Sequence, residues 1–304
     1  MLTHLHDRPT SPARVVILGS AGFVATATLR RLKTLGAPVL ELPRTELDLT
    51  SADASARLAD ILRPDDSLLF VSAKAPVKTE AMLIENIRMC TAVCEGLKKA
   101  PVSHVVYISS DAVYADSELP LTERSCAQPR SLHGVMHLTR EVMLANAFSG
   151  SLCFLRPTLI YGIGDPHNGY GPNRFMRLSA SGDNIALFGE GEERRDHVWV
   201  EDVAEIVSRV LFHRSDGVLN IAVGEVISFE EIAKQVTHLL PSATRINFSP
   251  RMGPIPHNGL RAFDVADLHA AFPDFRCMSL NEGLRKVAVL FKTQNAHHSA
   301  GQAD

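Results

Sequence analysis

The sequence offers little that would send the chain to a membrane or to a charged polymer. Its 304 residues contain no apolar run as long as a membrane span, and the N-terminal stretch "MLTHLHDRPTSPAR" lacks the apolar core of a signal peptide. A net charge of −3 gives no argument for nucleic acid or an anionic membrane as a partner. We therefore expect a cytoplasmic protein with neither kind of partner.

Cysteine is also scarce. The chain has five cysteines, an odd number whose spacing matches no disulfide framework: Cys90, Cys94, Cys126, Cys153 and Cys277. Cys90 and Cys94 would share one face of a helix. Because buried thiols behave as small apolar side chains, we expect this pair to pack in the core and not to act as a redox pair.

Short apolar runs alternate with stretches of helical periodicity. Strands are expected at 14–18, 38–42, 67–72, 104–109, 151–156 and 218–222, and helices at 23–35, 53–62, 80–99, 133–147, 202–213 and 229–239. This alternation predicts an α/β fold with a doubly wound, parallel Rossmann-type sheet that helices cover on both faces.

Three stretches depart from this rhythm. Residues 161–197 are rich in glycine and proline, and we expect a long irregular loop there, of the kind that often carries function. Residues 1–13 and 293–304 are polar and lack periodicity, so both are expected to be disordered tails.

The first expected strand–helix junction carries a glycine motif. In "VVILGSAGFVATATLRRL", Gly19 and Gly22 follow the strand and open the helix. Glycines let the backbone approach a pyrophosphate, and the helix N-terminus supplies N–H donors and positive potential. A tight turn without a ligand is the alternative. The dinucleotide contacts expected here are Gly19, Ala21, Gly22, Phe23 and Val24.

The second expected strand bears on the choice of cofactor. An acidic residue at its end would bind a ribose 2′-hydroxyl, whereas an arginine nearby suits a 2′-phosphate. Arg44 lies just past the strand in "VLELPRTELDLT", which favours NADP over NAD, unless Arg44 is only a surface residue. Asp48, next to Leu49, could accept a hydrogen bond from the adenine amino group or cap the following helix.

A set of motifs then follows in a fixed order: "LGSAGFVA", "ELDLTSAD", "FVSAKAP", "ENIRMCTAVCEGL", "YISSDAVYAD", "LRPTLIYG", "ALFGEGEERRDHVWVEDVAEIV" and "FDVADLHAAFPDFRCMSLNEGLRKV". Together they resemble the extended short-chain dehydrogenases/reductases of the NAD-dependent epimerase/dehydratase family. The resemblance implies a cofactor-binding Rossmann domain at 14–163 and about 198–222. A smaller, discontinuous substrate-binding domain would comprise 164–197 and about 223–292. It also implies a homodimer formed through the helices at 80–99 and 133–147.

The resemblance also assigns residues to roles. Ser110 matches the catalytic serine or threonine that holds the reacting sugar oxygen, and Ser109 and Asp111 flank it. The segments implied to lie along the cofactor are Ser72, Ala73, Lys74, Ser109, Arg156 and Pro157. The residues implied to hold a nucleotide sugar are Ser110, Asp111, Asn173 (a polar contact), Phe188 (a surface against the base) and Arg195 (a diphosphate clamp). A surface ion pair of Arg195 with Asp196 or Glu193 is the alternative.

The family's acid/base pair is changed. Relatives carry a tyrosine and, four residues later, a lysine, whereas "PRSLHGVMHLTRE" has His133 and His137 at those positions. An imidazole titrates near 6.5 without help, so His133 could move the proton while His137 binds the cofactor ribose. The pair could equally be a relic of lost function, or two histidines packed in a vacant cleft. A zinc clip would need a third ligand, which is not evident, so we expect no metal.

These features predict an NADP-dependent epimerase or reductase that acts on a nucleotide sugar or a related carbonyl or carbinol compound. Dehydratases of the family carry an Asp-Glu pair beside the serine, whereas Asp111 is followed here by Ala112, which argues against dehydration. Leu159 replaces a sugar-nucleotide asparagine of many relatives, which leaves the substrate open. The alternative function is a non-catalytic NAD(P)-binding protein, a sensor or an assembly partner.

Overall fold

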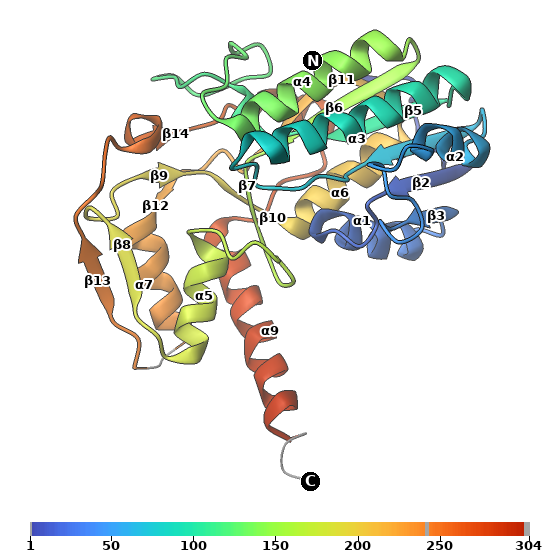
Figure 1. The fold of residues 1–304 in the computed structure, drawn as a ribbon. Coiled ribbons are helices and arrows are strands. Elements are labelled where there is room, and N and C mark those ends of the chain that lie inside the picture. Colours follow the sequence, from blue (N-terminus) through green and yellow to red (C-terminus); the bar gives the residue numbers. More distant parts are fainter. Residues whose placement is uncertain (1, 241–242, 301–304) are drawn as a thin grey trace.

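A seven-stranded sheet forms the centre of the molecule in the computed structural model, which describes residues 2–240 and 243–300 (Figure 1). Its strand order is β1-β11-β6-β5-β4-β2-β3, and every pairing is parallel except that of β1 with β11. The strands are β1 (Thr3–His4), β2 (Arg14–Leu18), β3 (Val39–Leu42), β4 (Asp66–Phe70), β5 (His104–Ile108), β6 (Ser151–Pro157) and β11 (Ser215–Ile221). The predicted doubly wound parallel sheet is confirmed.

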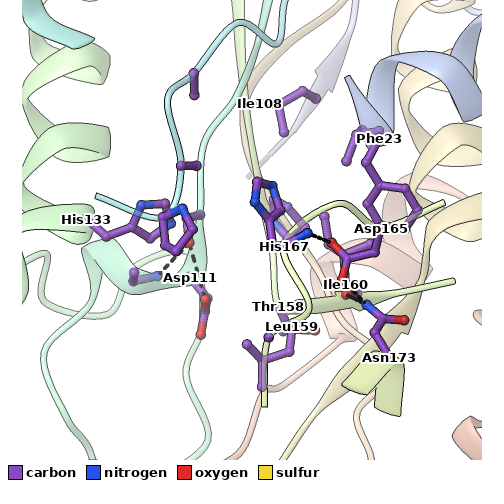
Figure 2. A pocket seen from close by; sticks show the side chains of 18 of the residues that line it. Phe23, Ile108, Asp111, His133, Thr158, Leu159, Ile160, Asp165, His167 and Asn173 are labelled. Carbon is purple, nitrogen blue, oxygen red and sulfur yellow. Dashed lines mark hydrogen bonds between the residues drawn. The ribbon is translucent and has the colours of Figure 1, made fainter. Parts of the chain in front are cut away.

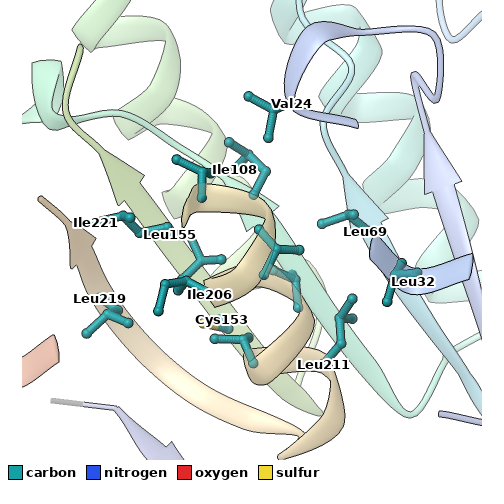
Figure 3. Packing of buried hydrophobic residues seen from close by; sticks show 14 of the residues in the cluster. Val24, Leu32, Leu69, Ile108, Cys153, Leu155, Ile206, Leu211, Leu219 and Ile221 are labelled. Carbon is teal, nitrogen blue, oxygen red and sulfur yellow. The ribbon is translucent and has the colours of Figure 1, made fainter. Parts of the chain in front are cut away.

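Helices cover both faces of this sheet because successive residues of each strand point to opposite faces. Val15 and Ile17 of β2 pack with α1 and α6, whereas Val16 and Leu18 pack under α2, α3 and α4. Figure 3 shows the first of these layers, with Ile206 of α6 close to Leu155 of β6. The helices are α1 (Phe23–Thr34), α2 (Ala54–Ile61), α3 (Glu80–Lys99), α4 (Leu132–Ala147) and α6 (Val200–Phe212).

A smaller part, at the left in Figure 1, has its own apolar cluster between α5, α7, α9 and strand β8. Three small sheets belong to the rest of the fold: β7 pairs with β10, β8 with β13, and β9 lies between β12 and β14. The strands are β7 (Leu159–Tyr161), β8 (Ile185–Phe188), β9 (Arg194–Arg195), β10 (His197–Trp199), β12 (Ile227–Ser228), β13 (Ile246–Ser249) and β14 (Leu260–Arg261). The helices are α5 (Pro172–Ser181), α7 (Phe229–Leu239), α8 (Ala266–Ala271), α9 (Leu280–Ala300), and the 3₁₀ turns η1 (Asp111–Val113) and η2 (Pro256–Gly259). The boundaries that we expect between two domains stay a prediction.

Both predicted tails need correction. The 1–13 segment contributes β1 to the sheet, and His4 fixes it through hydrogen bonds between its ring nitrogens and the Ser215 hydroxyl (2.7 Å) and Ala271 carbonyl (2.9 Å). At the other end α9 runs to Ala300, past the expected boundary at 293, while residues 301–304 lie outside the described residues. Two-residue strands and polar helical ends carry little periodicity, which is why the sequence did not reveal them.

The 161–197 segment is also more ordered than predicted. It contains α5, β8 and β9, so only its first part is irregular. Within the described ranges, no helix is long and apolar enough to cross a membrane.

Candidate active site

The glycine motif forms one end of an elongated groove. Gly22 is the N-cap of α1, and Gly19 has a φ of +81°, a left-handed conformation that favours glycine. A Cβ on Gly19 would come within 2.7 Å of the Ser72 Oγ and 2.9 Å of the Ser72 Cα, so the turn and the loop after β4 are in close contact. A cavity of about 300 Å³ lies here, lined by Gly19, Ala21, Gly22, Arg44, Leu47, Asp48, Leu49, Val71, Ser72, Ala73, Lys74 and Met89. The structure therefore brings nine of the predicted cofactor residues to one cavity: Gly19, Ala21, Gly22, Arg44, Asp48, Leu49, Ser72, Ala73 and Lys74.

Arg44 and Asp48 form the outer edge of this cavity. The Arg44 Nε donates to the Asp48 Oδ2 at 3.1 Å in an exposed ion pair. Hydrogen bonds from Thr50 to the Asp48 carboxylate lower the pKa of Asp48. Because α2 begins at Ala54 with Asp53 as its N-cap, Asp48 does not cap that helix, which removes one of its two predicted roles.

A second cavity, of about 420 Å³, continues the first. Gly22, Val71 and Ala73 line both, so the two form one path along the carboxyl ends of the strands. Figure 2 shows His133 and Asp111 on one side of it and Asp165, His167 and Asn173 on the other. The predicted residues in its lining are Gly22, Phe23, Val24, Ala73, Ser109, Ser110, Asp111, His133, His137, Pro157, Asn173 and Arg195, and Leu159 lies among them.

Ser110 opens the 3₁₀ turn that follows β5. Its Oγ accepts a hydrogen bond from the Ala112 N–H at 3.1 Å, which fixes the hydroxyl, and its contact with the Asp111 Oδ1 is long at 3.4 Å. The other oxygen of Asp111 accepts from the Arg261 Nε at 2.9 Å and lies 3.6 Å from the Arg195 Nη2. Two guanidinium groups thus contact the same oxygen of the Asp111 carboxylate.

His133 stands at the first turn of α4, beside η1. The Ser131 Oγ caps this helix by accepting from the Gly134 N–H at 3.1 Å. The Val77 N–H donates to the His133 Nδ1 at 3.5 Å, so the neutral ring carries its proton on Nε2. Burial lowers the pKa of His133, and the nearby Asp111 carboxylate opposes that shift.

His137 lies one turn deeper, and its ring is perpendicular to that of His133 with 4.7 Å between the centroids. It is buried, and its Nδ1 shares a 2.8 Å hydrogen bond with the Tyr107 hydroxyl. Burial, together with the neighbouring His133 and Arg140, keeps the pKa of His137 well below its ordinary value. In the part of the chain that the structure describes, no group of three or more His, Cys, Asp or Glu residues could hold a metal ion.

The side chains of two predicted cofactor residues form hydrogen bonds within the protein. The Ser109 Oγ donates to the Glu141 Oε1 at 2.6 Å. The Arg156 guanidinium forms a buried ion pair with Glu141, with bonds of 2.9 and 2.5 Å, and donates to the Tyr114 hydroxyl at 2.9 Å. Arg156 lines neither cavity, so its predicted contact with the cofactor is not borne out by its position; Ser109 and Pro157 do line the larger cavity.

Of the residues predicted to hold a nucleotide sugar, Asn173 and Arg195 line the larger cavity and Phe188 does not. Asn173 lines the cavity, but its amide is occupied by the Gly162 N–H (2.9 Å) and the Asp165 Oδ2 (3.0 Å). Phe188 lies outside the cavity lining, half exposed, with its ring 5.2 Å from that of Tyr170, which does line it. Arg195 lines the cavity and lies 3.4 Å from the Glu193 Oε1, so an ion pair with Glu193 is present as well, although it is largely buried and not on the surface as the alternative had it.

Several lining residues were missed. Asp165, His167, Tyr170 and His197 come from the stretch that the sequence marks only as irregular, so its glycines and prolines were the available signal. Arg261, on β14, reaches Asp111 from 150 residues away, and nothing local in the sequence marks that contact. Burial lowers the pKa of His197 to about 3.

Comparisons with known proteins agree with this architecture. The model of the NAD dependent epimerase/dehydratase family matches residues 15–222. A dTDP-4-dehydro-6-deoxy-D-allose reductase from Streptomyces bikiniensis is 25% identical over 325 residues, which cover 94% of this chain and 97% of that protein. A UDP-glucose 4-epimerase from Mycolicibacterium smegmatis is 24% identical over 315 residues, covering 93% of this chain and 99% of the relative.

Solved structures share the fold. A UDP-glucose 4-epimerase from Thermotoga maritima superposes with a TM-score of 0.81 at 20% identity, covering 92% of this chain and 99% of that one. A GDP-L-fucose synthetase from Naegleria fowleri bound to NADP has a TM-score of 0.80 at 16% identity, covering 97% and 98%. Since the family model spans more than half of the chain, the protein belongs to the NAD-dependent epimerase/dehydratase family.

Proposed function

We propose that the protein is an NAD(P)-dependent epimerase or reductase of a nucleotide-linked sugar or a related carbonyl or carbinol compound, with His133 in the place of the usual tyrosine. One observation carries this proposal. Ser110 and His133 line the same cavity, and that cavity continues through Gly22, Val71 and Ala73 into the groove at Gly19. A bound nicotinamide would supply or accept the hydride.

The groove fits a dinucleotide by its backbone chemistry. Gly19 and Gly22 let the chain approach a pyrophosphate, and the N-terminus of α1 supplies N–H donors. Arg44 at the outer edge would bind a 2′-phosphate, which supports NADP over NAD. His137, buried and neutral, would face the ribose in place of a lysine.

Ser110 would hold the reacting oxygen. Its Oγ already accepts the Ala112 N–H, so its own proton is available for a substrate oxygen, and the 3.4 Å contact with Asp111 competes weakly. The proton on the His133 Nε2 would reach the same oxygen, where negative charge develops as hydride arrives at a carbonyl carbon. Neutral imidazole can polarise a carbonyl in this way.

Full proton transfer depends on the charge state of His133. Donation requires imidazolium, and acceptance requires the neutral ring. Because burial lowers the pKa of His133, the neutral ring prevails at neutral pH without the neighbouring cation that a tyrosine needs. We therefore expect the carbinol oxidation rate to rise with pH through this pKa and the reduction rate to fall.

The nucleotide part of the substrate would lie toward Phe188 and Arg195. The exposed Phe188 ring offers a surface for a base, beside Tyr170. Arg195 can grip a diphosphate, which would compete with Glu193 and Asp111 for its guanidinium. The two curated relatives named above, a reductase of a dTDP-linked sugar and a UDP-glucose 4-epimerase, support this substrate class.

A turnover assay tests the proposal. Purified protein is incubated with NADP⁺ or NADPH and a panel of UDP-, dTDP-, GDP- and ADP-sugars, alongside Ser110→Ala, His133→Phe and the exposed control His238→Phe. We expect His133→Phe to lower kcat about 100-fold or more while cofactor affinity holds, and the control to behave as wild type. Cofactor binding without turnover of any sugar would instead support the non-catalytic sensor or assembly partner.

We also propose a homodimer through α3 and α4. Both helices present an apolar side chain to solvent, Ile84 (52% exposed) and Val142 (54% exposed). Sedimentation of wild type and Ile84→Glu should show a dimer that the variant weakens, whereas a monomeric wild type would contradict this.

A further inference from the structure

Arg140 is an uncommon feature of the core. It lies on α4 one turn beyond His137, and its side chain is fully buried. Across residues 2–240 and 243–300, no carboxylate forms an ion pair with it. A guanidinium stays charged in proteins, and burying it is costly unless its donors are satisfied. The groups that satisfy Arg140 therefore indicate its role.

Every acceptor of Arg140 is neutral. Its Nη1 donates to the Ser72 carbonyl at 2.8 Å, and its Nε and Nη2 donate to the Asn86 carbonyl at 3.0 and 2.8 Å. The Nη2 also donates to the Asn86 Oδ1 at 2.9 Å. The guanidinium carbon lies 4.9 Å from the centroid of the Phe70 ring, a cation–π contact.

These acceptors belong to one loop and its anchor. Residues 71–79, here called the wall loop, connect β4 to α3. Asn86, on α3, anchors this loop through two hydrogen bonds to Lys74. Its Oδ1 accepts the Lys74 N–H and its Nδ2 donates to the Lys74 carbonyl, both at 3.0 Å. Arg140 thus grips the wall loop directly at Ser72 and indirectly through Asn86.

The wall loop borders both cavities and contacts His133. Val71 and Ala73 line both cavities, and Ala75 and Pro76 line the larger one. Further along, the Val77 N–H donates to the His133 Nδ1. The position of this loop therefore sets the shared wall of the two cavities and the orientation of the His133 ring.

We propose that Arg140 is a positioning residue, a buried cationic fork that holds the wall loop against α4 and so fixes the groove wall and the hydrogen bond to His133. It touches neither cavity and takes no part in the chemistry. The relevance to a cofactor rests on the proposed function, whereas the hold on the loop can be measured without any ligand.

Hydrogen–deuterium exchange of the ligand-free protein tests the hold. Arg140→Lys keeps the positive charge but loses the planar set of guanidinium donors, and Arg140→Met loses both. Asn86→Ala removes the side-chain hydrogen bonds of Asn86 to Lys74 and to Arg140. The matched control is Arg14→Lys, an arginine paired with Asp66 at the far end of β2. We expect the three test variants to speed exchange at 72–79 about tenfold, and the control to leave that loop unchanged.

The His133 ring gives a second readout that core packing alone would not move. The charged and titratable groups that face His133 are Asp111 in η1, His167 in the loop after β7, and His137 and Arg140 on α4 itself. In an NMR titration, Arg140→Met should raise the pKa of His133, because a cation is lost and solvent enters, and Arg140→Lys should raise it less.

The outcomes separate the two proposals. If Arg140→Lys and Asn86→Ala destabilise the whole protein as Arg14→Lys does, yet leave 72–79 exchange and the His133 titration as in wild type, Arg140 is a structural core residue and the inference fails. The ligand-free readouts decide this even where wild type binds no NADP(H), a result that would count only against the proposed function.

Discussion

Replacing Gly134 with alanine tests the close contact between α4 and η1. It follows His133 in α4, and a Cβ at this position would lie 2.0 Å from the Ala112 carbonyl oxygen and 2.8 Å from the Ala112 carbonyl carbon. Ordinary contact starts near 3.4 Å, so Gly134→Ala forces α4 and η1 apart by about 1.4 Å. The obstacle is backbone, which cannot rotate away as a side chain can.

Two effects of opposite sign compete in Gly134→Ala. Helix propensity alone predicts a gain of up to about 1 kcal/mol. Overpacking against fixed backbone costs about 1–3 kcal/mol and moves His133 away from Ser110. We expect the steric cost to win, with Tm lower by about 2–6 °C and kcat/KM lower by about 100-fold, since a displacement near 1 Å can cost that much.

Thermal unfolding followed by fluorescence, with turnover measured in parallel, checks this prediction. Gly169→Ala is the matched control for stability, because a Cβ there meets nothing within 4 Å. A Gly134→Ala protein that is more stable than wild type and equally active would refute the reasoning, since α4 and η1 would then not be held in contact.

Three other perturbations have defined outcomes. Burial lowers the pKa of His104 to about 4, so neutral His104 adds stability above pH 6.5 that is lost as pH falls. Wild type should lose about 3 kcal/mol more than His104→Asn between pH 7 and 4 in urea unfolding, and equal losses would contradict this. Glu141→Gln leaves the buried Arg156 without its anion and should cost about 3–5 kcal/mol, checked by the denaturant midpoint; a cost below 1 kcal/mol would show that the pair is dispensable. Arg44→Ala should weaken NADP binding about tenfold in calorimetry and leave NAD unchanged, whereas equal effects on both would remove the basis for an NADP preference.

Most of the fold could be predicted because the short apolar runs of the central strands alternate with stretches of helical periodicity. The buried "RVVIL" run is β2, and the helix predicted at 80–99 is α3 with the same ends. The two-residue strand β1 could not be found this way. This strand is held by hydrogen bonds of His4 with Ser215 and Ala271, which lie more than 200 residues away in the sequence.

The site residues that could be predicted are those marked by a local sequence motif. Gly19, Ser110 and His133 lie at the carboxyl ends of strands or the start of a helix, so motif and position agree, and all three border the joined cavities. Arg156 differs because its sequence context does not reveal that Glu141, on the helix directly before its strand, accepts hydrogen bonds from its guanidinium. Arg261 acts on Asp111 only through tertiary contact.

A crystal structure of the protein with NADP tests the central claim most directly, at the ring of His133. We expect NADP to lie along both cavities, with a His133 nitrogen about 4–5 Å from the nicotinamide C4, beside the Ser110 hydroxyl, and open space above the nicotinamide ring. A structure without NADP in the groove, or with side chains filling the space above the ring, would contradict hydride transfer assisted by His133.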